Sequence, residues 1–184
     1  MMSVEQVQLE MKDQFARAGL LPFLIEESSQ VLDLGDEFFA EVVLSDRAKL
    51  GEANDLMREI LSSSALGGKS YTLVVRSKWL VESVGDPAPA YGQDGGLRAA
   101  VLIPIILQSG SERTPVTVAV TKLAEMEFDR ILGRKTDLKQ VAKLVIDSAL
   151  RRGGRSFWDP TTENYLEVAS GAVANISRLL KQTA

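Results

Sequence analysis

Three apolar stretches decide the fold: SYTLVVRSKWLVES (residues 70–83), LRAAVLIPIILQ (97–108) and TPVTVAVT (114–121). In the first and third, apolar and polar side chains alternate, and a period of two is typical of a strand with one buried face. The second is apolar on both faces, which is typical of a strand covered on both sides. The sequence therefore predicts a meander of three antiparallel strands over about residues 70–121.

Pairing buried face with buried face sets a register for this meander, because a slip of one residue turns a whole face over. Trp79 is then expected opposite Val101, and Glu82 opposite Arg98. The same register gathers basic groups and aliphatic side chains on the second face. These residues are Arg76, Lys78, Glu82 and Arg98 beside Val74, Leu80, Leu102 and Ile106.

Helical periodicity flanks the meander on both sides. Helices are expected over about 4–18, 46–63, 123–132, 137–152 and 160–181. Ser3 with Gln6 forms the pattern of a capping box, and Asp159 followed by Pro160 is a pattern of helix starts. Thr136 is the expected cap of the fourth helix.

Residues 20–45 allow two interpretations. One is a strand with a kink at Gly35, which puts Phe38 and Val42 on one face. The other is a helix that starts at Asp36. The β-branched and aromatic content favours the strand. The chain as a whole is expected to form a single α+β domain over 1–184, with an antiparallel sheet of three to four strands packed against helices from both ends.

The composition excludes several kinds of chemistry. The 184 residues include no cysteine and no histidine, which excludes disulfides, thiolate nucleophiles, Cys/His zinc sites and Ser-His-Asp catalysis. No cofactor is expected. An enzyme would have to use carboxylates, Lys, Arg, Tyr, Ser, Thr or an oxygen-ligated cation.

Charge is unevenly distributed along the chain. The net charge is −8 over residues 1–66, 0 over 67–132 and +4 over 133–184. The acidic and basic parts either face each other or a neighbouring subunit, or they provide a partner-binding surface of one sign. The N-terminus lacks a signal-peptide pattern, and no apolar run is long enough to span a bilayer, so a cytoplasmic location without membrane contact is expected.

Two loops carry candidate binding groups. The segment 85–96 is long for a hairpin connection, and its chemical groups are Tyr91 and Asp94. It is either a binding loop or a solvent-exposed turn. Arg151, Arg152 and Arg155 precede Trp158 and suit an anion or single-stranded nucleic acid. The alternative is that these arginines interact with a helix C-terminus while the tryptophan anchors the segment in the core.

The mixed second face carries the leading functional hypothesis. Lys and Arg laid on apolar surface suggest a groove or an interface, unless flanking helices cover it. The sequence therefore predicts a non-catalytic cytoplasmic binding or assembly protein that engages a protein partner, as a homo-oligomer. The alternative is an enzyme or small-ligand binder with a pocket under the 85–96 loop. Its candidate residues are Arg76, Lys78, Glu82, Tyr91, Asp94 and Arg98. Nucleic-acid binding is disfavoured by the acidic composition.

Overall fold

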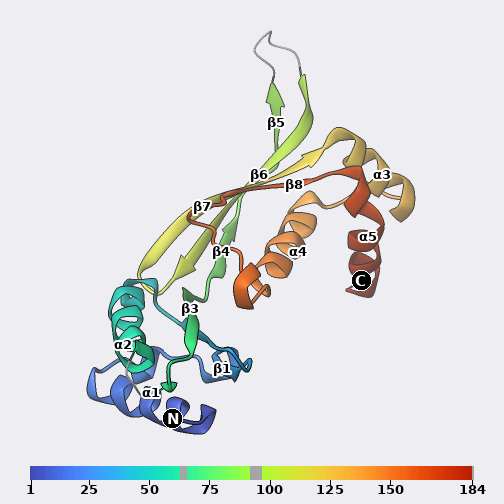
Figure 1. The fold of residues 1–184 in the computed structure, drawn as a ribbon. Helices are drawn as coiled ribbons and strands as arrows, with labels where there is room; N and C mark the ends of the chain where they lie inside the picture. Colours follow the sequence, from blue (N-terminus) through green and yellow to red (C-terminus); the bar gives the residue numbers. More distant parts are fainter. Residues whose placement is uncertain (63–65, 92–96, 184) are drawn as a thin grey trace. The chain divides into compact units, whose positions relative to one another are not determined.

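The computed structural model describes residues 1–62, 66–91 and 97–183; for Ser62, Tyr91 and residues 97–99 it describes the backbone alone. The chain divides into two compact units (Figure 1). Unit 1 comprises Met1–Trp79 and Ser109–Glu112, and unit 2 comprises Leu80–Gln108 and Arg113–Ala184. The number of independently folding domains stays a prediction.

Unit 1 combines two helices with a three-stranded sheet. Its helices are α1 (Val4–Arg17) and α2 (Leu50–Ser62), with 3-10 turns η1 (Leu21–Phe23), η2 (Glu26–Ser28) and η3 (Arg47–Lys49). Its strands are β1 (Gln30–Asp33), β2 (Glu37–Leu44) and β3 (Ser70–Ser77). The sheet order is β1-β2-β3, with β1 antiparallel and β3 parallel to β2.

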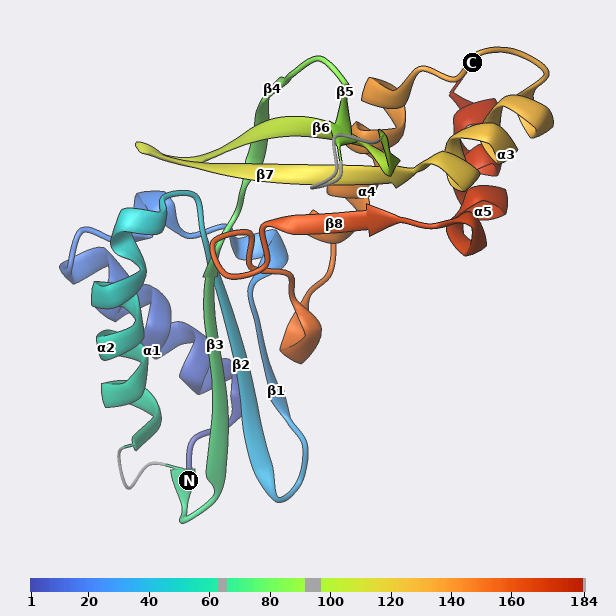
Figure 2. The same ribbon diagram turned by 90° about the horizontal axis from the view of Figure 1, so that it is seen from above.

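The core of unit 1 lies between this sheet and its two helices (Figure 2). The buried cluster combines Phe38, Ala40, Val42 and Leu44 of β2 with Val7, Met11 and Phe15 of α1 and Ala53, Met57 and Leu61 of α2. The predicted capping box is confirmed, because Gln6 N donates to Ser3 Oγ at 3.3 Å and Ser3 N donates to Gln6 Oε1 at 2.7 Å. This box fixes the start of α1.

The strand interpretation of residues 20–45 is confirmed for Glu37–Leu44, and the helix starting at Asp36 is wrong. Gly35 is not a kink within one strand. It lies in the turn that reverses the chain between β1 and β2, with a φ of 91°. The Asp33 carboxylate accepts a hydrogen bond from Gly35 N at 2.9 Å and so stabilises this turn.

Unit 2 combines a five-stranded sheet with three α-helices among its described residues. The strands are β4 (Leu80–Val84), β5 (Ala88–Tyr91), β6 (Leu97–Ser109), β7 (Glu112–Thr121) and β8 (Tyr165–Val168). The order is β4-β6-β7-β8, and β5 also pairs with β6. The helices are α3 (Lys122–Leu132), α4 (Leu138–Leu150) and α5 (Val173–Gln182), with 3-10 turns η5 (Gly154–Ser156) and η6 (Ser170–Ala172).

One face of this sheet is buried, as its alternation predicts. The buried side chains are Val101, Ile103, Ile105 and Leu107 of β6 and Val116, Val118 and Val120 of β7. Helix α4, which buries Val141, Ala142 and Ile146, lies along one face of the sheet (Figures 1 and 2). The apolar faces of β6 and β7 and the apolar stripe of α4 therefore pack together in one core.

The α+β class is confirmed, but the single antiparallel sheet of three to four strands is wrong. The structure has two sheets, and both are mixed because β2 with β3 and β7 with β8 run parallel. The stretch 70–83 divides at Lys78 and Trp79 into β3 and β4, which belong to different units. A period of two identifies a strand but not its neighbour, and this is why the pairing was mispredicted.

The predicted register of the first hairpin is wrong for the same reason. Val81 lies opposite Leu107, and a bulge follows before Ser83 pairs with Ile106. Glu82 therefore lies in a bulge, far along β6 from Arg98.

The helix predicted over 160–181 is wrong in its first half. Residues 159–163 form a turn, in which the Asp159 carboxylate accepts from Thr161 N at 3.0 Å and Asp159 O accepts from Glu163 N at 2.9 Å. Strand β8 follows and pairs in parallel with β7, so α5 begins only at Val173. An Asp-Pro pair starts turns as well as helices.

The cap predicted at Thr136 is also displaced by one residue. Asp137 caps α4, accepting from Lys139 N at 3.1 Å. The hydroxyl of Thr136 instead donates to the Asp129 carboxylate at 2.7 Å.

Gly110 provides a test of the β6–β7 turn. Its φ is +61°, and a Cβ at this position would collide with the side chain of Asp46, which caps η3. We expect Gly110→Ala to lower the free energy of unfolding by about 3 kcal/mol, from left-handed strain plus steric overlap. Gly133→Ala is the matched control, because its φ is +66° and nothing lies within 4 Å. It should cost about 1 kcal/mol in chemical denaturation; equal costs would contradict the predicted collision.

Lys69 and Asp33 provide a second test. Lys69 Nζ lies 2.9 and 3.0 Å from the two Asp33 carboxylate oxygens, and it holds the pKa of that carboxyl below its usual range, together with the Gly35 N–H. We expect Lys69→Met to raise the pKa of Asp33. Because the pKa of Asp33 is lower in the folded state, its carboxylate stabilises the fold above about pH 4, and this contribution is lost as the pH falls through the folded-state pKa. The variant should therefore lose less stability on acidification than the wild type does.

NMR titration of the Asp33 side-chain carbon measures this shift. Lys139→Met is the control, because Lys139 Nζ lies 2.7 Å from Asp86 Oδ1 and lowers the pKa of Asp86 instead. The control should raise the Asp86 pKa alone. An unchanged Asp33 titration in Lys69→Met would show that the ion pair does not set its pKa.

Candidate functional site

The predicted second face is not a face of a single sheet, because β3 belongs to the sheet of unit 1 and β4 and β6 belong to the sheet of unit 2. Arg76 and Lys78 lie in unit 1, whereas Glu82 and Arg98 lie in unit 2. Lys78 is exposed directly after β3, and its backbone N donates to Leu44 O at 2.7 Å. The predicted residues therefore have to be considered separately.

Arg76 lies within the sheet of unit 1 and forms a buried ion pair. Its Nε donates to Glu41 Oε2 at 2.9 Å, and the side chains are 16% and 3% exposed. Gln30 Nε2 donates to the other Glu41 oxygen at 3.2 Å. Side chains from all three strands thus converge on one buried carboxylate, which makes Arg76 a structural residue.

Arg76→Met should therefore destabilise the protein. Removing one partner leaves a buried carboxylate without its counter-charge, and we expect a loss of about 3 kcal/mol in the free energy of unfolding. Arg113→Met is the matched control, because that arginine pairs with Glu82 while 60% and 32% of the two side chains are exposed. The control should cost less than about 1 kcal/mol. Equal costs in urea denaturation would contradict the structural role.

Glu82 lies at a groove in unit 2. The bulge in β4 presents its carboxylate to Arg113, whose Nε lies 2.9 and 2.8 Å from its two oxygens. These two residues line a groove of about 410 Å³ with Ser83, Ile106, Thr114 and Pro115. Glu82 and Ile106 were both predicted on the second face. Arg113 was missed because the third strand was predicted to begin at Thr114, whereas β7 begins at Glu112.

The groove belongs to a larger surface, here called the open face. Ile105 and Leu107 point into the core, so Pro104 and Ile106 point to the opposite side of β6. Pairing brings Ser83 beside Ile106 and Tyr165 beside Thr117 on that side. The open face consists of Leu80, Ser83, Pro104, Ile106, Pro115, Thr117 and Tyr165, with the Glu82–Arg113 pair.

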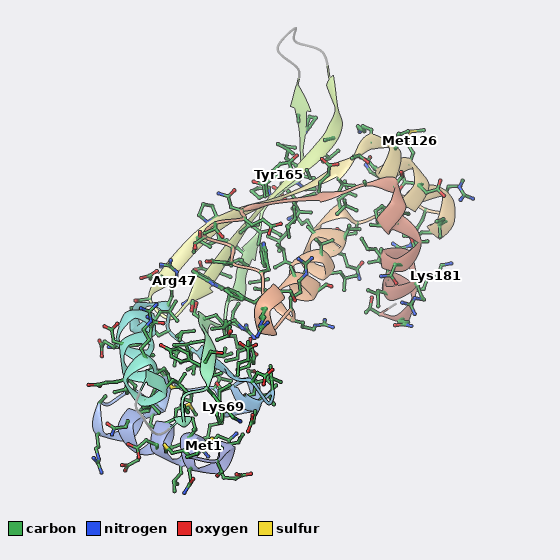
Figure 3. The ribbon with its side chains drawn as sticks, in the orientation of Figure 1. Met1, Arg47, Lys69, Met126, Tyr165 and Lys181 are labelled. Carbon is green, nitrogen blue, oxygen red and sulfur yellow. The ribbon has the colours of Figure 1, made fainter. Side chains whose placement is uncertain are left out.

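The apolar part of the open face is accessible. Leu80 is 60% and Tyr165 50% exposed, and both proline side chains are exposed. Figure 2 looks onto this side of the sheet, where β6, β7 and β8 lie in front of α4, and Figure 3 labels Tyr165 on β8. Tyr165 was missed because its segment was predicted to be helical. The parallel pairing of β8 with β7 is a long-range contact that no local pattern signals.

The 85–96 segment is only partly a loop. Residues 88–91 form β5, which pairs with β6 through Ala88 and Leu102. Asp94 and the side chains of Tyr91 and Arg98 lie outside the described residues. A pocket formed by this segment stays a prediction.

The arginine-rich segment ends in a buried anchor. Arg151 and Arg152 are exposed after α4, and Arg155 is exposed in η5. Trp158 is buried, and its Nε1–H donates to Glu163 O at 2.9 Å. Its ring therefore has no open face for stacking on a base, while anion binding by the arginines stays a prediction.

Neither a metal cluster nor a membrane helix is present in the part of the chain that the structure describes. Within it, no three His, Cys, Asp or Glu side chains gather as metal ligands would. None of its helices combines the length and the apolar character needed to cross a bilayer. Comparison with protein-family models, with curated proteins and with solved structures finds no match for this chain.

Proposed function

We propose that this protein is a non-catalytic cytoplasmic assembly protein that self-associates through the open face of unit 2. The observation that carries the proposal is the accessible apolar surface on one side of a well-packed sheet. Contiguous exposed apolar residues on a folded protein often mark an interaction site. Leu80, Ile106, Pro115 and Tyr165 give the open face aliphatic and aromatic anchors of the kind that interfaces use.

The charge pattern of the open face supports a second copy of the chain as the occupant. A two-fold dimer brings the same patch onto itself. Glu82 and Arg113 are adjacent and opposite in charge, so a rotated copy can place its arginine near the partner's carboxylate. A surface that is both apolar and internally charge-balanced is thus complementary to itself, whereas a charged partner would find no net attraction there.

Leu80→Glu tests this proposal. A carboxylate buried within an apolar interface must be desolvated, so we expect dimerisation to weaken at least about tenfold, or roughly 1.4 kcal/mol. Leu123→Glu on α3 is the matched control, because Leu123 is 68% exposed and Leu80 60%, and Leu123 lies outside the open face. Sedimentation equilibrium measures the effect, with circular dichroism to check folding. A monomeric wild type at about 100 μM, or equal weakening by both variants, would refute the proposal.

Charge reversal provides the internal check on the same interface. Glu82→Arg and Arg113→Glu should each weaken the dimer, and the double variant should recover most of the lost affinity because it restores the alternating pattern. Failure of the double variant to recover would place the dimer contact elsewhere.

A further inference from the structure

Unit 1 has a groove of different character along α1. Two adjoining hollows of about 270 and 430 Å³ share Met2 and Glu10 among their lining residues. The apolar lining residues are Met2, Leu9, Leu56 and Ile60, contributed by both α1 and α2 and by the residues before α1. Leu9 is 70% exposed. Ile60 belongs to the buried core of unit 1, and Met2 and Leu56 pack against that core. The four side chains thus form an apolar strip that joins the exposed Leu9 to the edge of the core.

The charged groups that line this groove are all carboxylates. Glu10, Asp13 and Glu59 lie along it, and none of its lining residues is Lys or Arg. Of the two cations of α1, Lys12 Nζ lies 3.5 Å from Glu26, which does not line the groove. Arg17 lies 2.8 Å from the groove carboxylate of Asp13, so Asp13 is paired within α1. Unit 1 as a whole has 14 Asp and Glu against 8 Lys and Arg, a net charge of −6.

We propose that this groove is a docking site for a basic amphipathic helix of a partner protein. The apolar strip matches the apolar stripe of such a helix, and the carboxylates along it match flanking Lys and Arg. The α1 residues Gln6, Leu9 and Asp13 line the groove at the spacing i, i+3 and i+7 of one helix face, which suits a third helix packed along α1. Methionine adapts its shape to varied apolar partners.

The dimensions set the length of the docked segment. The strip begins at Met2, just before α1, and follows the helix to Asp13, roughly 17 Å in all. A partner helix of about 12–16 residues, apolar at i, i+3 or i+4, and i+7, covers that length. The net negative charge of unit 1 also attracts such a segment before contact, so the association rate should fall with ionic strength.

A synthetic peptide tests the proposal on the full-length protein. The probe is a 16-residue, fluorescein-labelled peptide of Leu and Lys arranged with one apolar helical face; the comparison is a scrambled peptide of the same composition. Fluorescence anisotropy should show binding of the amphipathic peptide at least about tenfold tighter than the scrambled one, weakened about tenfold between 50 and 500 mM salt. Equal binding of both peptides would reduce the effect to non-specific charge attraction and overturn the proposal.

Matched variants locate the site. Glu10→Lys and Leu9→Ser should each weaken peptide binding at least about fivefold, whereas Glu27→Lys and Leu32→Ser, at exposed positions outside the groove, should change it less than about twofold. Equal losses of peptide affinity in the groove variants and the control variants would show that the peptide does not bind in the groove. If Leu9→Ser instead converts a peptide-free oligomer of the protein to a monomer, a second copy occupies the groove and the partner proposal fails. Leu80→Glu should bind the peptide normally, which separates this result from the dimer of unit 2.

Discussion

The carboxylate of Glu41 is buried in the central strand of unit 1, and a charge in that position is tolerated only when it is paired. Arg76 on β3 and Gln30 on β1 provide the partners, so the pair joins the three strands as well as neutralising the charge. On the opposite face of β2, the apolar side chains from Phe38 to Leu44 pack against α1 and α2. The strand can therefore be buried on both faces although it carries an acid, and the rest of unit 1 is arranged around it.

In unit 2 the sheet is apolar on both faces of β6, but the described helices cover only one of them. Its sheet buries one face against α4 while the other keeps Leu80 and Tyr165 accessible. An antiparallel sheet with one solvated face normally alternates apolar with polar residues. Here β6 is apolar on both faces, and Ile106 and Pro104 remain where polar residues would serve a monomer. The face of β6 that the described helices leave uncovered is therefore apolar, and this is the basis of the proposed self-association.

The parts of the fold that were predicted correctly depend on local interactions. The start of α1 follows from Ser3 and Gln6, which are neighbours in sequence, and the buried face of β6 and β7 follows from alternation alone. Strand pairing is not local, and residues 70–83 contain no signal that separates β3 from β4. The prediction of the candidate site was the most affected, because it placed Arg76 and Glu82 together by a strand register that the structure does not have. Arg113 was missed because β7 begins before the predicted third strand, and Tyr165 was missed because β8 joins the open face only through its pairing with β7.

The charge gradient along the chain acquires a structural meaning from the division into units. Unit 1, with a net charge of −6, carries the whole excess of carboxylates, whereas unit 2 has 13 Lys and Arg against 11 Asp and Glu, a net charge of +2. The two proposed surfaces differ accordingly: the open face is apolar and charge-balanced, while the groove along α1 is apolar and acidic. Self-association through the first depends mainly on the hydrophobic effect and is little affected by salt. Docking at the second depends on charge steering and weakens as salt screens it. Ionic strength therefore separates the two interactions in the intact chain without any substitution.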